Sequence, residues 1–193
     1  TTSDRPMRAA ALDMVVAAFA KAPVQNPDKI PGIHLHLELD EANIPLPLGV
    51  TDPREFPFKF KETKTNHFGT LAQRNPDALA NPNRTNILAA KARVYRYCLV
   101  QDFINFGTLS QYAYNGIGEI GGNDFVISIS AQVHQDGFRD IDDQAATFMH
   151  ELGHSLGLRH GGGVDAGKTN SWVGKPNYPS LMNYALTHPL KNK

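Results

Sequence analysis

The sequence has little cysteine, no excess of charge of either sign and no long apolar run, and each shortage excludes a class of protein. Its single cysteine, Cys98, rules out an internal disulfide framework. The 19 Lys and Arg residues balance the 19 Asp and Glu residues, so the basic surface typical of a nucleic-acid-binding protein is missing. No apolar run reaches the roughly 18 residues that span a bilayer. We therefore expect neither a nucleic-acid partner nor a membrane partner.

What remains is the composition of an ordinary globular domain. The chain has 193 residues, of which 41% are hydrophobic, enough for one domain with a true core and a cleft. No internal repeat or low-complexity segment divides it. We expect a single domain over 1–193, made of an N-terminal subdomain (1–160) and a short C-terminal subdomain (161–193).

Hydrophobic periodicity in the first half predicts a helix and then a strand. Residues 3–22 carry apolar side chains at helical spacing, with Ser3 or Asp4 as the N-cap. Residues 32–40 alternate strictly between apolar and polar side chains, which predicts a strand with one buried face. The proline-rich stretch 43–86 reads as a long, partly helical connection.

The second half predicts further strands and one long helix. We expect a short helix at 86–92, a strand within 93–103, an edge segment at 116–120, a turn at 121–123 and a strand at 124–130. A helix should begin near Asp140 and end at Gly157. This order predicts an α/β (α+β) lobe with a mostly parallel, twisted sheet, a backing helix and a second helix, followed by a small irregular lobe.

The second helix contains the most informative stretch, HELGHSLGLRH, at residues 150–160. At about 100° per residue, its apolar side chains share one face, on which the helix should be anchored. These are Ala145, Phe148, Met149, Leu152 and Leu156. His150 and His154 project from nearly the opposite face, one turn apart. Gly157 permits a sharp turn after which His160 can return to the same point.

Three converging imidazoles predict a metal site. Three nitrogen ligands leave a fourth position open for water, which is typical of a catalytic rather than a structural zinc ion. Glu151 lies beside the histidines but is rotated away from them, so it suits proton transfer better than ligation. The alternative, an amphipathic helix that merely contains histidines, does not explain the spacing.

These residues resemble the signature of the metzincin metallopeptidases, HExxHxxGxxH, at every fixed position. The stretch SLMNY at 180–184 is similar to their Met-turn, which implies that Met182 lies beneath the metal. Tyr184 matches the Met-x-Tyr pattern of the astacin and serralysin branches, in which this tyrosine helps to stabilise the reaction intermediate. The single cysteine excludes the disulfides of astacins and adamalysins, and the branch stays open.

The resemblance implies a zinc endopeptidase with one catalytic Zn²⁺. In that mechanism, the zinc lowers the pKa of a bound water to about 7 and Glu151 removes its proton. The substrate would be an extended peptide or protein lying along the edge segment 116–120. The resemblance also implies a secreted, extracellular protein, and we expect a monomer.

Two other functions remain open from the residues alone. A zinc-stabilised peptide-binding or adhesion domain would use the cleft without cutting, and a zinc hydrolase could act on a non-peptide amide or ester. Among lesser signals, His34 and His36 suit a solvated sheet face better than a second metal site. Helix capping explains the acidic residues at 140–143 more simply than a calcium site does. Cys98 is expected to be a buried, inert thiol.

Overall fold

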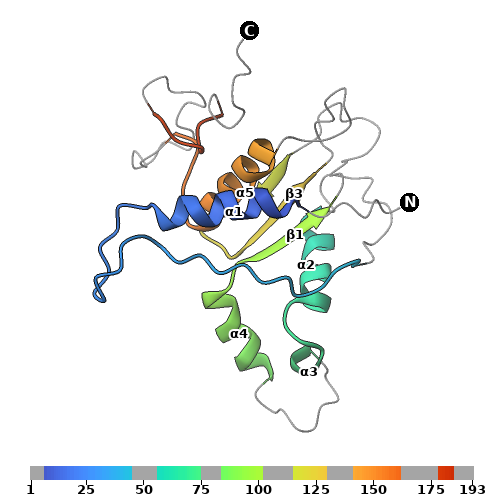
Figure 1. The fold of residues 1–193 in the computed structure, drawn as a ribbon. Coiled ribbons are helices and arrows are strands. Elements are labelled where there is room, and N and C mark those ends of the chain that lie inside the picture. Colours follow the sequence, from blue (N-terminus) through green and yellow to red (C-terminus); the bar gives the residue numbers. More distant parts are fainter. Residues whose placement is uncertain are drawn as a thin grey trace, which may run out of the picture.

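The computed structural model describes residues 7–44, 56–74, 84–101, 115–129, 141–161 and 178–184 (Figure 1). Five helices and three strands lie in these ranges. In chain order they are α1 (Ala9–Ala20), α2 (Phe56–His67), α3 (Leu71–Arg74), α4 (Arg84–Val94), β1 (Tyr97–Gln101), β2 (Gly116–Gly118), β3 (Asp124–Ser128) and α5 (Ile141–Ser155). No helix in the described ranges is long and apolar enough to cross a membrane.

The strands form one mixed sheet in the order β1-β3-β2. β3 pairs in parallel with β1, from Tyr97 opposite Asp124 to Gln101 opposite Ser128. β2 pairs with the other side of β3 in antiparallel fashion, with Ile117 opposite Val126. The short β2 is therefore an edge strand of the described sheet, as the sequence predicted for 116–120.

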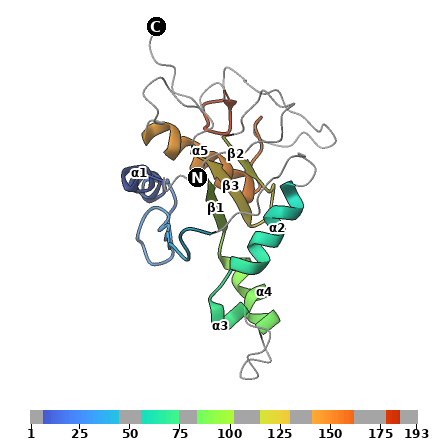
Figure 2. The same ribbon diagram turned by 90° about the vertical axis from the view of Figure 1, so that its right-hand side faces the viewer.

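Alternation along β3 divides the core between the two faces of the sheet (Figure 2). Phe125 and Ile127 point toward α1 and α5, where they form the larger apolar cluster with residues of both helices. Val126 points the other way, into a second cluster with Phe68, Tyr97 and others on the side of α2 and α4. α1 and α5 thus cover one face of the sheet, and α5 packs against β3, the strand next to the edge strand β2.

The first helix is confirmed, but it begins later than the sequence predicted. α1 starts at Ala9, and its N-cap, Arg8, makes no side-chain capping hydrogen bond. Ser3 and Asp4 lie outside the described residues, and the predicted cap at either of them was wrong for this helix start. Ala11 and Val15 are buried as expected, whereas Met14 is 44% exposed.

The strand predicted at 32–40 was wrong, because the structure assigns no strand to this segment. Leu35 packs against the core, but Leu39 on the same alternating face is 84% exposed. Alternation favours an extended chain, and a strand also requires a partner that supplies ladder hydrogen bonds. Only Gln25 and Pro31, just before the segment, form a single bridge among the described residues.

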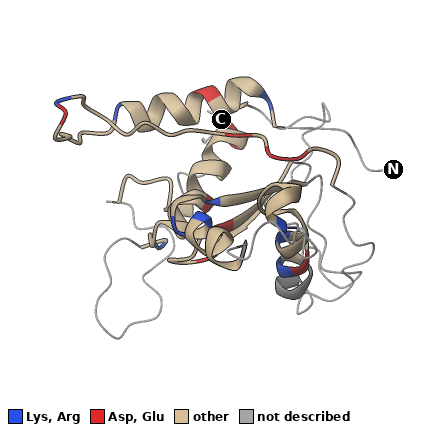
Figure 3. Ribbon diagram, turned by 90° about the horizontal axis from the view of Figure 1, so that it is seen from below, with Lys and Arg blue, Asp and Glu red and all other residues tan. Residues whose placement is uncertain are grey.

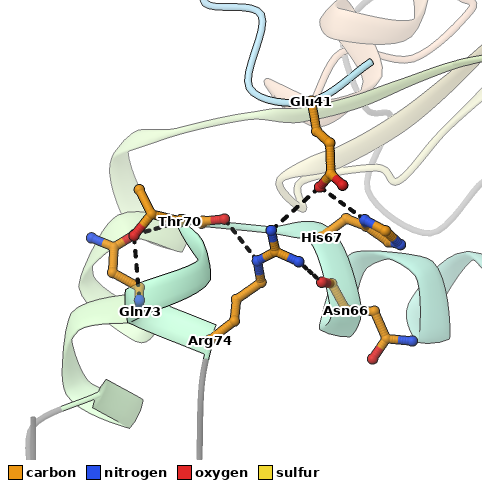
Figure 4. Close-up of polar contacts among 7 residues, drawn as sticks. Glu41, Asn66, His67, Thr70, Gln73 and Arg74 are labelled. Carbon is orange, nitrogen blue, oxygen red and sulfur yellow. Dashed lines mark hydrogen bonds and ion pairs between the residues drawn. The ribbon is translucent and has the colours of Figure 1, made fainter. Parts of the chain in front are cut away.

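Side-chain contacts hold the end of this segment against the α2–α3 corner (Figure 4). The Glu41 carboxylate lies 2.9 Å from His67 Nδ1 and 3.3 Å from Arg74 Nη2. Arg74 also donates to the backbone oxygens of Gly69 and Asn66. The segment is therefore attached by ionic contacts near Glu41 rather than by sheet pairing.

The predicted α/β (α+β) fold class is confirmed, with the sheet mixed in its pairing. Lys and Arg residues are scattered among Asp and Glu residues over the described ribbon (Figure 3), in keeping with their equal numbers. Of the predicted C-terminal subdomain, the structure describes Gly161 and residues 178–184, and the remainder lies outside the described residues.

Candidate metal centre and active site

α5 carries the first two histidines of the motif on a helix that is buried over most of its length. Asp142 and Asp143 occupy its first turn, where negative charge interacts favourably with the helix dipole. Phe148 packs edge-on against Phe125, with 5.2 Å between the ring centroids. Leu152 is 3% exposed, but Leu156, predicted to lie on the same anchoring face, is 51% exposed because the helix ends at Ser155.

A tight turn after α5 brings the third histidine back. Gly157 has a φ of +91°, a conformation that is accessible to glycine at little cost. The N–H of Gly157 donates to His154 O, and the N–H of Leu158 donates to Gly153 O, closing the C-terminal turn of the helix. The predicted role of Gly157 is therefore confirmed, and His160 lies beside the two helical histidines.

The three histidines converge through their Nε2 atoms. His160 Nε2 lies 3.1 Å from His150 Nε2 and 3.0 Å from His154 Nε2. Ligand atoms of all three lie within 4.8 Å of one another. Tetrahedral zinc, with bonds of about 2.0–2.1 Å, separates its nitrogen ligands by roughly 3.3 Å. The spacing of the donor set thus fits a metal ion of this size.

Backbone carbonyls orient two of these rings. His150 Nδ1 donates to Leu181 O at 2.7 Å, and His154 Nδ1 donates to Leu158 O at 2.9 Å. With Nδ1 protonated, the Nε2 of each neutral ring carries a lone pair directed at the common point. Burial lowers the pKa of both His154 and His160, which favours the neutral, ligating form. The arrangement is that of a cation-binding site.

Glu151 lies on the side of α5 that faces β2. Its side chain is buried, with 6% exposure, and its carboxylate lies against Gly116 and Gly118 of the edge strand. Burial raises the pKa of Glu151 to about 8. A carboxylate with a pKa near neutrality is suited to accept and return a proton.

The stretch predicted to resemble a Met-turn contacts the histidines through Leu181 and Tyr184. Met182 is 2% exposed, and a Cβ built on Gly153 would lie 2.5 Å from its Sδ, so a side chain at position 153 would displace Met182. Tyr184 packs its ring on the site, with centroids 4.2 Å from His160 and 5.5 Å from His150. Tyr184 is 50% exposed and can therefore meet a ligand from solvent.

One protein-family model matches this chain over residues 59–161, and its description is metallo-peptidase family M12B, reprolysin-like. The match covers more than half of the sequence and includes the whole histidine motif. The chain belongs to this family. No curated protein and no solved structure matched it.

Membership of family M12B identifies the chain as a metallopeptidase, which implies a peptide or protein substrate. The matched region runs from α2 to Gly161 and contains all three converging histidines. It ends before Met182 and Tyr184, so the Met-turn and the likeness to the astacin and serralysin branches stay predictions.

The other residues considered as candidate sites have different surroundings in the structure. In the described part of the chain, the three converging histidines are the only group of three or more metal-ligating side chains. His34 and His36 are exposed on the 32–40 segment. Cys98 lies within β1, and burial raises the pKa of its thiol well above the usual range, which disfavours the reactive thiolate. Asp140 lies outside the described residues.

Sequence reasoning missed the backbone groups that shape the site. The carbonyls of Leu181 and Leu158 orient His150 and His154. Because every residue has a backbone carbonyl, the sequence gives no sign of this role. The close approach of Gly116 and Gly118 to α5 was also missed. Two glycines at alternate positions of an edge strand could have signalled it, because glycine in a strand often marks the close approach of another segment.

Proposed function

We propose that this chain is a zinc-dependent endopeptidase that hydrolyses extended polypeptides. His150, His154 and His160 hold the ion, Glu151 acts as general base, and Tyr184 assists the reaction. The observation that carries the proposal is the convergence of three Nε2 atoms, two of them on rings held in the ligating tautomer by backbone carbonyls. Lone pairs gathered so closely repel one another unless a metal ion or a proton lies between them.

The chemistry divides between the ion and the side chains. When bound, zinc supplies an activated water near neutral pH and polarises the carbonyl of the scissile bond. Glu151 takes the proton of the attacking water and passes it to the departing amine. Its burial against β2 places it away from bulk water, so that this proton is not lost to solvent.

The edge strand offers a place for an extended substrate. Asn115 and Glu119 form backbone hydrogen bonds with β3, as Ser128 N–H to Asn115 O and Glu119 N–H to Asp124 O. In an antiparallel pair, the residues between such partners direct their backbone groups to the opposite side. Gly116 and Gly118 therefore offer their N–H and C=O groups at the outer edge, where a peptide strand can add.

Tyr184 would act on the same bond. Its ring stacks on His150 and lies tilted against His160, while half of the residue remains exposed. A phenolic hydroxyl near the ion donates to the oxyanion that forms during attack. This supports the catalytic role that the Met-x-Tyr resemblance implied.

The proposal is tested by incubating the purified protein with casein and a peptide library, with and without a chelator. Fragments that disappear with the chelator and return with added zinc are expected. His154→Ala should lose both zinc and cleavage, whereas the matched variant His34→Ala, which alters an exposed histidine, should keep both. Binding of peptides without cleavage would instead indicate a binding domain, and turnover of small amides alone would indicate a non-peptide hydrolase.

Three further expectations accompany the proposal. We infer that 1–193 functions as one catalytic domain, that it acts as a monomer, and that it acts outside the cell. Light scattering tests the second, and the distribution of the native protein between cells and medium tests the third. A dimer, or a protein retained wholly inside the cell, would contradict them.

A further inference from the structure

The edge strand β2 faces α5 with no side chains at all. Its first and third residues are Gly116 and Gly118, and both point toward the helix. Ile117, between them, points to the other face and packs against the second apolar cluster. The side of β2 that meets the active-site helix is therefore bare backbone.

The space that a side chain would occupy at Gly116 is filled by Glu151. A Cβ built there would lie 2.5 Å from Glu151 Cγ and 2.7 Å from Oε1. Real Cβ atoms essentially never approach another heavy atom within 3.0 Å, so the carboxylate would have to move. All of these nearest atoms belong to the Glu151 side chain.

Gly118 meets a different part of the same helix. A Cβ there would lie 2.7 Å from the backbone oxygen of Glu151 and 2.7 Å from His154 Cβ. Neither atom can swing away by a side-chain rotation, so the helix itself would have to shift. The missing side chain at Gly116 thus leaves room for the Glu151 side chain. The missing side chain at Gly118 instead allows β2 and α5 to approach each other closely.

We propose that Gly116 and Gly118 are positioning residues, whose missing side chains set the place of the Glu151 carboxylate and of the His154 turn of α5. This inference rests on the proposed function, in which Glu151 is the general base. Neither glycine has a positive φ, so an alanine fits the backbone and its effect comes from the contact alone. The bare strand also leaves its outward backbone groups close to the base.

The two alanine variants should fail differently. Gly116→Ala displaces the carboxylate and leaves the histidines in place, so we expect normal zinc content, a similar KM and a kcat lower by about 100-fold. Gly118→Ala shifts the helix with His154, so both zinc content and kcat should fall. Gly122→Ala, whose Cβ would lie nearest to atoms of the exposed Glu119 side chain, should keep kcat within about twofold.

A double-mutant cycle on thermal unfolding tests the contact without any assay of activity. Glu151→Ala removes the atoms that the new methyl group would strike. Gly116→Ala should lower Tm by several degrees in the native background and leave it unchanged in the Glu151→Ala background. Gly118→Ala should lower Tm in both backgrounds, because the helix backbone and His154 Cβ remain.

The outcomes separate this inference from the proposed function. If the native protein cleaves no peptide, the proposed function fails, but the Tm cycle still decides whether Gly116 makes room for Glu151. If Gly116→Ala does not fold, the inference requires that the double variant with Gly116→Ala and Glu151→Ala folds to the same extent as Glu151→Ala alone. An unchanged kcat in Gly116→Ala, or an equal loss of Tm in both backgrounds, would overturn the inference.

Discussion

The two helices that cover the same face of the sheet, α1 and α5, bury very different side chains. α1 buries only Ala11 and Val15, both apolar, and has no side-chain cap. α5 buries most of its length, including seven polar residues. These are Asp143, Gln144, Thr147, His150, Glu151, His154 and Ser155.

The difference separates the helix that mainly stabilises the fold, α1, from the helix that also carries the candidate site, α5. Burial of apolar side chains stabilises the fold, whereas burial of polar and ionisable groups costs free energy unless they are partnered. α1 therefore contributes packing, and α5 combines packing with buried polar groups, among them two of the three histidines that could hold a metal ion. Substitutions in the two helices should separate stability from catalysis.

The largest loss of activity is expected from Glu151→Ala, a substitution in α5. The variant lacks the base but keeps all three histidines, so cleavage should fall by about 10²–10⁴-fold while zinc content stays normal. Peptide turnover and metal analysis of the same preparation measure both. Glu119→Ala, at an exposed glutamate of the β2–β3 turn, is the matched control. A fully active Glu151→Ala would remove Glu151 from the mechanism.

Tyr184→Phe should give the next largest effect. The phenyl ring keeps its packing on the histidines and loses only the hydroxyl, which we propose stabilises developing charge. We expect kcat to fall by roughly 10–100-fold with little change in KM or Tm. Steady-state kinetics and thermal unfolding distinguish this from a packing role, for which kcat would stay unchanged.

Val15→Ala tests the packing role of α1, because Val15 is fully buried in this helix. Removing its two methyl groups should lower the free energy of unfolding by about 1–3 kcal/mol. Zinc content and kcat of the folded variant should stay at native levels. Met14→Ala, at a side chain that is 44% exposed, should cost much less in denaturant titrations. A loss of zinc in Val15→Ala would mean that α1 shapes the metal site.

The smallest effect should come from the Glu41 contacts, far from the two helices. The hydrogen bond from His67, together with the charges of His67 and Arg74, lowers the pKa of Glu41 below 4.5. Their stabilisation is therefore present above pH 4.5 and is lost as the pH falls through the lowered pKa. Glu41→Gln should have a slightly lower Tm at neutral pH, and the difference should vanish in acid. A difference that persists at low pH would contradict this ionic role.

The sequence predicted the parts of the structure that depend on local pattern. The helix containing His150, the turn at Gly157 and the return of His160 follow from periodicity and spacing within about a dozen residues. β3 and the edge segment were likewise marked by alternation and by glycines. For these elements the local preferences and the final fold agree.

The remaining features depend on partners distant in the chain. Alternation at 32–40 could not reveal that this segment pairs with no strand among the residues that the structure describes. The carbonyl of Leu181 orients His150 from 31 positions away, and Gly116 receives the side chain of Glu151 across the sheet edge. Such contacts arise only when α5, β2 and the segment after the motif come together.

The most direct test of this account is the zinc content of the purified protein, measured together with the X-ray absorption spectrum of the bound metal. The account predicts one zinc per chain with three imidazole nitrogens at about 2.0–2.1 Å, and loss of that zinc in His160→Ala. A protein that binds no divalent metal, or a His160→Ala variant that keeps it with the same spectrum, would contradict the account.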